Sequence, residues 1–237
     1  MNKPKVAVVT GGARGIGKAI CDAFAEKGVA VCTIDLLDND YFVGDIADEN
    51  TLRRFAAKVI SDYGAIDYLI NNACLSRGGL NTCSYDDFNY VLRVGVTAPF
   101  FLTQLFQEHF NAQACIVNIS STRHLMSQAD TESYTAAKGG ISALTHAMAV
   151  TLAGKARVNA ISPGWIDTTG AAFKGPDADQ HPAGRVGTPA DIVHAAMFLC
   201  SPESSFITGQ DIAIDGGMTK LMVYHNDFGW TYDSKGE

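Results

Sequence analysis

The stretch TGGARGIG at residues 10–17 decides the fold of this chain. The run before it, at residues 5–9, is rich in valine and predicts a buried strand. The apolar spacing after it predicts a helix over residues 15–27 that ends at Gly28. Glycines between a strand and a helix start permit a sharp turn and close approach to a pyrophosphate, which a helix N-terminus attracts. The stretch therefore predicts a dinucleotide-binding turn, with a Gly-rich structural turn as the alternative.

An acidic residue ends the next predicted strand, which covers residues 29–34. Asp35 follows Gly15 by twenty residues, the place of a carboxylate that accepts a hydrogen bond from a ribose 2′-hydroxyl. Because such a carboxylate repels a 2′-phosphate, the sequence predicts NAD as the cofactor. Arg14 keeps NADP as an alternative, since a guanidinium in the turn could reach that phosphate. A solvated surface charge is the simpler interpretation of Arg14.

A second group of residues suits acid–base chemistry. Tyr134 and Lys138 are four residues apart, which places both side chains on one face of a helix. Ser121 comes just after the predicted strand at 114–119. A phenol, a cation and a hydroxyl that meet at a strand end can move a proton to or from an alcohol or carbonyl oxygen. A buried tyrosine with a satisfied hydroxyl is the alternative, but the dinucleotide-binding turn in the same chain favours catalysis.

Strand-like and helix-like patterns alternate along the chain. This alternation predicts a single-domain α/β fold, a doubly wound, Rossmann-like parallel sheet in three αβα layers. Only residues 36–40 separate the second and third strands, too few for a full crossover helix. The expected strands are residues 5–9, 29–34, 41–44, 67–71, 114–119, 156–161 and 211–214, and the expected helices are residues 15–27, 48–63, 85–110, 133–153 and 188–201.

Composition argues against several other classes of protein. The 237 residues carry a net charge of −7, which disfavours a nucleic-acid partner. No apolar run reaches about eighteen residues, so no membrane span is expected, and the early first strand leaves no room for a signal peptide. The six cysteines show no Cys-x-x-Cys spacing, which indicates reduced thiols in a cytoplasmic protein and predicts no metal site.

Together these motifs resemble the short-chain dehydrogenase/reductase family, in its compact single-domain branch, over residues 5–217. Residues 10–17 match the family's cofactor turn, and Ser121, Tyr134 and Lys138 match its catalytic residues. The resemblance implies an oxidoreductase that transfers a hydride between NAD(H) and a small alcohol or ketone substrate. Tyr134 would be the general acid/base, Ser121 would orient the substrate oxygen, and Lys138 would also bond the nicotinamide ribose. A dihydrodiol or hydroxysteroid dehydrogenase is the alternative with the same chemistry.

The resemblance also assigns the residues that would hold the cofactor. Asp45 and Ile46 match a pair that the family places beside the adenine ring, and residues 71–73 match its Asn-Asn-Ala strand end. Residues 163–168 match the segment that holds the nicotinamide carboxamide, and residues 215–217 match the closing motif of the last strand. The full expected cofactor set is Gly11, Arg14, Gly15, Ile16, Gly17, Asp35, Asp45, Ile46, Asn72, Ala73, Tyr134, Lys138, Pro163, Gly164, Ile166 and Thr168.

Two positions depart from the family pattern. Gly95 stands where the family carries an Asn that completes a proton relay. We therefore expect a working but altered relay, with a water in the place of the amide. A non-catalytic dinucleotide sensor is the alternative from another functional class. Cys74 stands where Gly is usual, which indicates a packing substitution.

The substrate side carries weaker signals. Arg123 could bind a carboxylate or phosphate of the substrate, or it could be a solvated loop charge. His124 carries little information alone, and the same holds for His181 and Arg185 near the substrate loop. The segment between residues 168 and 185 is rich in Gly and Pro, so we expect it to be irregular and mobile.

The remaining expectations concern domain organisation and assembly. Residues 1–217 should form the catalytic domain, and residues 218–237 an extension with four aromatic residues. We predict that this extension folds over an active site, its own or a neighbour's, with packing on the domain surface as the alternative. The family forms dimers and tetramers through two long helices, which implies a homodimer or homotetramer here through residues 85–110 and 133–153.

Overall fold

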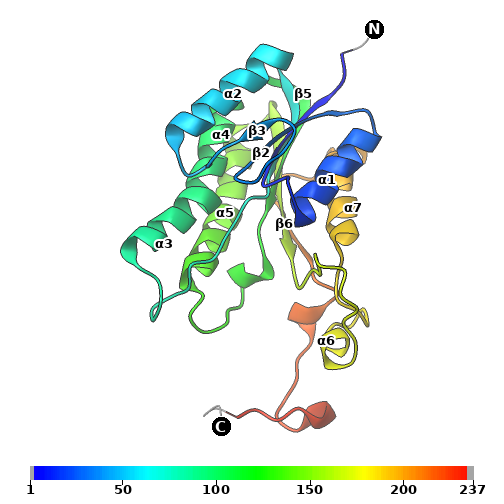
Figure 1. Cartoon of the computed structure of the whole chain (residues 1–237). Coiled ribbons are helices and arrows are strands. Elements are labelled where there is room, and N and C mark those ends of the chain that lie inside the picture. The colour runs from blue at the N-terminus through cyan, green and yellow to red at the C-terminus, as the bar shows by residue number, and fades with distance from the viewer. Residues whose placement is uncertain (1–2, 234–237) are drawn as a thin grey trace.

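The computed structural model describes residues 3–233. A seven-stranded parallel sheet with the order β3-β2-β1-β4-β5-β6-β7 has helices on both faces (Figure 1). This architecture confirms the predicted doubly wound α/β fold. The strands are β1 (Val6–Thr10), β2 (Ala30–Asp35), β3 (Phe42–Val43), β4 (Ile66–Asn71), β5 (Phe110–Ile119), β6 (Ala156–Pro163) and β7 (Asp211–Ile214). The α-helices are α1 (Gly15–Glu26), α2 (Glu49–Tyr63), α3 (Tyr85–Leu92), α4 (Ala98–Phe106), α5 (Glu132–Thr151), α6 (Pro176–Asp179) and α7 (Pro189–Leu199).

Two hydrophobic cores cover the two faces of the sheet. Strand side chains alternate between them, because successive residues of a strand point to opposite faces. Val8 and Ile116 pack into the core beneath α2, α4 and α5, whereas Val9 and Val117 pack into the core beneath α1 and α7. Both faces of the central strands are therefore mainly apolar.

The strand order reverses at β1, which pairs with β2 on one side and β4 on the other. Connections from neighbouring strands leave in opposite directions at such a point, so a crevice opens at their carboxyl ends. The short connection after β2 was predicted correctly, because β3 pairs directly with β2 without an intervening helix.

The expected helix at 85–110 differs from the structure in two respects. A five-residue π-helical segment, η1 (Arg93–Thr97), separates α3 from α4, and α4 ends at Phe106. The strand β5 begins at Phe110 because this residue pairs with Ile66 of β4. The end of the predicted helix and the start of the predicted strand at 114 were therefore wrong by four residues each.

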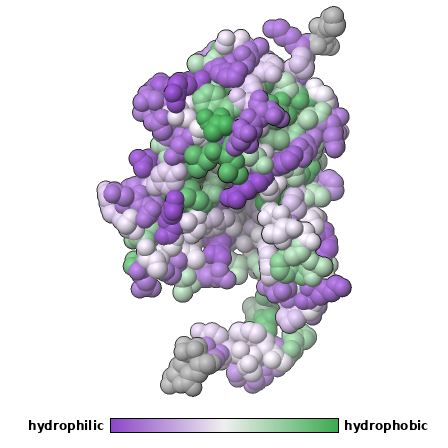
Figure 2. All heavy atoms as spheres, viewed as in Figure 1, coloured by the Kyte–Doolittle hydropathy of each residue, from purple (hydrophilic) through white to green (hydrophobic). Residues whose placement is uncertain are grey.

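The carboxyl-terminal extension stands clear of the domain, beyond the edge formed by the strand carboxyl ends (Figures 1 and 2). Its rings contact one another: Trp230 stacks on Tyr232 at 5.8 Å, whereas Phe228 is 94% exposed. Residues 234–237 of the predicted extension lie outside the described residues. Among residues 3–233, no helix combines the length and apolar composition that crossing a membrane requires.

Candidate active site

The turn after β1 is closed so tightly that it excludes side chains. A Cβ on Gly17 would lie 2.1 Å from the carbonyl oxygen of Gly11. Asn72, just after β4, donates its side-chain amide to the carbonyl oxygens of Thr10 and Gly11 at 3.1 and 2.9 Å. The hydroxyl of Thr10 accepts the backbone N–H groups of Asn72 and Ala73 at 3.0 and 3.1 Å. The end of β4 thus holds the turn that leads into the N-terminus of α1.

The carboxylate of Asp35 is fixed at the end of β2. One oxygen accepts the N–H of Ala13 and the other that of Leu37, both at 3.0 Å. Each oxygen keeps a second lone pair, so Asp35 can still accept a hydrogen bond from a sugar hydroxyl. Its neighbours Leu36 and Leu37 are exposed apolar residues, and Arg14 is exposed at the N-cap of α1.

Asp45 has a partner that the sequence did not suggest. Its carboxylate accepts the hydroxyl of Tyr90 from α3 at 3.0 Å and the N–H of Ala47 at 2.8 Å. Burial and the hydrogen bond to this carboxylate raise the pKa of Tyr90, so the phenol stays protonated and keeps donating. The guanidinium of Arg77 lies 5.9 Å from the same ring.

These elements line one cleft of about 780 Å³ at the carboxyl ends of the strands. Ten predicted cofactor residues lie in it: Gly11, Arg14, Gly15, Ile16, Asp35, Asp45, Ile46, Asn72, Ala73 and Thr168. The predicted residues outside its lining are Gly17, Tyr134, Lys138, Pro163, Gly164 and Ile166. Sequence reasoning missed Leu36, Leu37, Arg77 and Tyr90, which belong to no motif and reach the cleft only through the fold.

The predicted catalytic residues come together from β5 and α5. Ser121, 8% exposed, follows β5, and its hydroxyl oxygen accepts the N–H of Arg123 at 3.2 Å. Lys138, 4% exposed, donates from Nζ to the carbonyl oxygen of Ile119 at 2.7 Å. The same Nζ lies 5.4 Å from the ring centroid of Tyr134. Lys138 therefore connects the end of β5 with the phenol one turn earlier on α5.

Arg123 adds a second cation beside the phenol. Its guanidinium carbon lies 6.0 Å from the ring centroid of Tyr134, and the group donates a short hydrogen bond to the side-chain oxygen of Gln128. Because Gln128 is neutral, the charge of Arg123 is not neutralised by this contact. Arg123 is thus a cation near the ring of Tyr134 whose side-chain hydrogen-bond partner is neutral.

Gly95 lies where η1 packs against α5. It is buried, and a Cβ there would lie 2.8 Å from the Cβ of Ala137, the residue before Lys138. The two helices approach so closely that an asparagine side chain would need one of them to move. The glycine at position 95 is therefore linked to the close packing of η1 against α5.

The segment after β6 closes into a loop through Ile166, which bridges to Gly187. The expected irregular stretch contains one helical turn, α6, and Trp165 packs on Phe173 with ring centroids 4.8 Å apart. Arg185 binds Asp191 at the start of α7 through two contacts of 2.6 and 2.8 Å. This guanidinium holds the pKa of the Asp191 carboxyl well below its usual range, so Arg185 serves the helix start.

Cys74 and His181 each contact a nearby backbone carbonyl oxygen. The thiol of Cys74 lines the cleft and lies 3.7 Å from the carbonyl oxygen of Leu75. His181 is buried, with Nδ1 donating to the carbonyl oxygen of Asp177 at 3.0 Å. All six cysteines are free thiols.

Comparisons with known proteins agree with this geometry. A family model described as enoyl-(acyl carrier protein) reductase matches residues 11–219. An uncharacterised oxidoreductase of Thermotoga maritima is 40% identical, with 94% of this chain and 99% of the relative covered. The structure of an apo SCOR enzyme from Clostridium thermocellum has a TM-score of 0.89 and 42% identity, covering 98% and 99% of the two chains. A 4-hydroxyisoleucine dehydrogenase complexed with NADH has a TM-score of 0.84 and 29% identity, covering 92% and 100%.

Proposed function

The chain belongs to the short-chain dehydrogenase/reductase family, and on that premise we propose that it transfers a hydride between NAD(H) and a small alcohol or ketone. Tyr134 is the general acid/base of this reaction. The observation that carries the proposal is the position of Lys138, which bonds the end of β5 and lies 5.4 Å from the ring of Tyr134. A phenol, an ammonium group and the turn of Ser121 at the carboxyl end of β5 are the groups that proton transfer to a carbonyl oxygen requires.

Each residue has a separate task in the proton transfer. The hydroxyl oxygen of Ser121 accepts from Arg123, so its own hydrogen stays free to donate to the substrate oxygen. Tyr134 gives a proton to that oxygen in reduction and takes it in oxidation. Lys138 uses one N–H on Ile119, and its two other N–H groups can hold the nicotinamide ribose. Bound NAD(H) supplies or accepts the hydride.

The cleft fits a dinucleotide in three respects. The glycine turn lets the backbone approach a pyrophosphate, and the first N–H groups of α1 have no partner within the helix. Asp35 can accept from the adenosine ribose, and Leu36 beside it offers no charge to a 2′-phosphate. Arg14 is the one cation of the turn itself, and its exposed position supports the surface interpretation. We therefore propose NAD as the preferred cofactor.

Arg123 suggests that the substrate carries an anionic group. A guanidinium with only a neutral partner, 6.0 Å from the catalytic ring, can bind a carboxylate in bidentate fashion. One structural neighbour is named for a hydroxy amino acid, which also carries a carboxylate.

We further propose a homodimer or homotetramer formed through the helical segments 85–110 and 133–153. Phe100 on α4 and Val150 on α5 are exposed apolar residues on these segments, and burying them against a second copy would be favourable. The free thiols support a reducing compartment such as the cytoplasm.

A substrate panel with wild type and Tyr134→Phe tests the catalytic proposal. In NADH fluorescence titrations we expect the two proteins to have the same affinity for NADH. The turnover of the variant should be lower by about 10²- to 10⁴-fold. Tyr85→Phe, an exposed tyrosine, is the matched control. Unchanged turnover in Tyr134→Phe would refute the mechanism, and NADH binding without turnover of any alcohol or ketone would favour the dinucleotide sensor.

Pairs of ketone substrates that differ only in carrying a carboxylate or the corresponding amide test the role of Arg123. Arg123→Gln should weaken the binding of the carboxylate substrates and leave that of the amides unchanged.

A further inference from the structure

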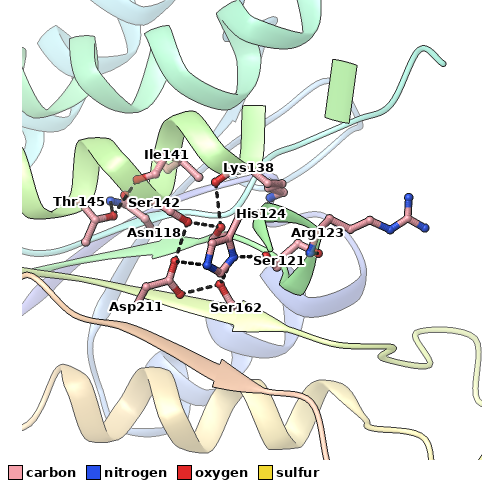
Figure 3. Close-up of polar contacts among 11 residues, drawn as sticks. Asn118, Ser121, Arg123, His124, Lys138, Ile141, Ser142, Thr145, Ser162 and Asp211 are labelled. Atoms are coloured by element: carbon pink, nitrogen blue, oxygen red, sulfur yellow. Dashed lines mark hydrogen bonds and ion pairs between the residues drawn. The ribbon is translucent and has the colours of Figure 1, made fainter. Parts of the chain in front are cut away.

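We propose that His124 and Asp211 form a positioning pair that holds Ser121 in its catalytic orientation, an inference that rests on the proposed function. His124 belongs to η2 (Thr122–His124), directly after β5, and Asp211 begins β7. The strand β6 lies between β5 and β7, so the pair connects the catalytic turn with the edge of the sheet across a whole strand (Figure 3).

The imidazole of His124 forms a hydrogen bond with the backbone of Ser121. Its Nδ1 lies 2.6 Å from the carbonyl oxygen of Ser121, and since a carbonyl only accepts, Nδ1 carries the hydrogen. The backbone N–H of His124 donates to the same oxygen at 3.1 Å. The hydroxyl oxygen of Ser121 is held separately by the N–H of Arg123. The orientation of Ser121 thus depends on three donors, of which the imidazole is the only side chain.

Asp211 holds the other side of the imidazole. One carboxylate oxygen accepts the hydroxyl of Ser162 and the other that of Ser142, both at 2.5 Å. The oxygen that binds Ser142 lies 3.8 Å from Nε2 of His124, so the carboxylate faces the side of the imidazole opposite Ser121. Ser162 also lies 3.3 Å from Nδ1 of His124. The carboxylate is only 18% exposed, and the two serine hydroxyls supply the hydrogen-bond donors that a largely buried carboxylate requires.

A second branch runs from Asp211 to the catalytic helix. Ser142 belongs to α5 and gives its only hydroxyl hydrogen to Asp211. The single hydroxyl hydrogen of Ser120 is therefore shared between the oxygen of Ser142 at 2.7 Å and the carbonyl oxygen of Lys138 at 3.1 Å. One carboxylate therefore connects with the turn of Ser121 and with the helix of Lys138.

The network is placed for positioning and not for contact with substrate or cofactor. Ser120 and Ser162 are buried, and the side chains of His124 and Asp211 are only 16% and 18% exposed, so the network has little surface to offer a substrate or cofactor. Loss of the His124 contact should therefore leave cofactor binding unchanged and let Ser121 move. A misplacement of about 1 Å near a reacting group costs up to about 100-fold in rate.

The test compares His124→Leu, which removes the donor, with His124→Asn, whose amide N–H can replace Nδ1–H. The matched control is His109→Leu, because Nδ1 of His109 makes the same kind of contact, with the carbonyl oxygen of Gly64 at 3.0 Å, outside the catalytic edge. Asp211→Asn tests the other residue of the pair and changes the packing less than His124→Leu does. Amide hydrogen exchange of residues 121–126 is measured on the protein alone, followed by the NADH dissociation constant, kcat and KM.

We expect His124→Leu to raise exchange of residues 121–126 and to lower kcat, each by about 10-fold or more, with NADH affinity within about 2-fold of wild type. His124→Asn should recover most of both effects, Asp211→Asn should give an intermediate loss, and His109→Leu should change neither. Exchange that stays at the wild-type rate in His124→Leu overturns the proposal, as does raised exchange with unchanged kcat. A wild type without turnover refutes the proposed function instead, and the exchange comparison still decides the contact.

Discussion

The two sides of the active site are built by different means. The glycine turn on the cofactor side depends on backbone geometry: Gly11 and Gly17 close on each other, and backbone N–H groups fix the carboxylate of Asp35. The catalytic side depends on side chains from separate elements: His124 contacts the carbonyl oxygen of Ser121 at 2.6 Å and lies 3.8 Å from the carboxylate of Asp211. Backbone geometry tolerates almost no substitution, whereas a side-chain network can be changed one contact at a time. The two sides should therefore respond differently to mutation.

The largest effect is expected on the cofactor side, for Gly17→Ala. The new Cβ would lie 2.1 Å from the carbonyl oxygen of Gly11, so the turn must open and dinucleotide affinity should fall by about 100-fold. Gly139→Ala on α5 is the control, because a Cβ there meets nothing within 4 Å. It should leave affinity unchanged and stabilise the helix slightly. Titration of NADH fluorescence measures both, and wild-type affinity in Gly17→Ala would remove the steric argument.

A second effect is expected where the two sides meet, at Gly95→Asn. Its Cβ would lie 2.8 Å from that of Ala137, so the variant should lose about 2 kcal/mol of unfolding free energy through overpacking. The double variant with Ala137→Gly should lose less than the sum of the two single changes, because Ala137→Gly removes the opposing methyl. Urea unfolding of the four proteins measures this coupling. Strict additivity would show that the helices adjust without strain.

The features that could be predicted from the sequence lie mainly on the cofactor side, and those that could not lie mainly on the catalytic side. The glycine turn and Asp35 were predicted because strand, turn and helix patterns are local, and the structure places them in one cleft. The contact between Tyr90 and Asp45, and the pair of His124 and Asp211, join residues far apart in the chain. No spacing rule encodes such contacts, since they depend on the order of strands in the sheet. His124 was therefore interpreted as an isolated histidine, although it contacts Ser121 directly.

A third prediction returns to the cofactor side, for Asp35→Asn. The amide lacks the charge that repels a 2′-phosphate, so NADH should bind about 10-fold more weakly and the preference for NADH over NADPH should shrink by a similar factor. Asp38→Asn, an exposed acid three residues further on, is the matched control. Parallel titrations with NADH and NADPH measure the ratio. An unchanged ratio in Asp35→Asn would assign cofactor choice to another residue, with Arg14 the next to test.

The smallest effect on the isolated fold is expected from removing the carboxyl-terminal extension after Thr219. This cut keeps the contacts of Thr219 with Asp215, at 2.6 and 2.9 Å, which close the last strand. The rings beyond it pack on one another, and none of the described residues of the extension lines its own chain's cleft. Truncation should therefore change the unfolding free energy by less than about 1 kcal/mol.

Assembly and substrate affinity should respond more than folding. Exposed aromatic residues in one segment favour a partner surface, and we propose that a neighbouring copy of the chain is this partner. We expect the truncated protein to shift towards smaller assemblies in sedimentation, and its KM for substrate to rise about 3-fold while NADH affinity is kept. Trp230→Ala in the full chain should reproduce part of the shift, because it removes the ring between His225 and Tyr232. Unchanged stability, assembly and kinetics after truncation would refute a role over any active site.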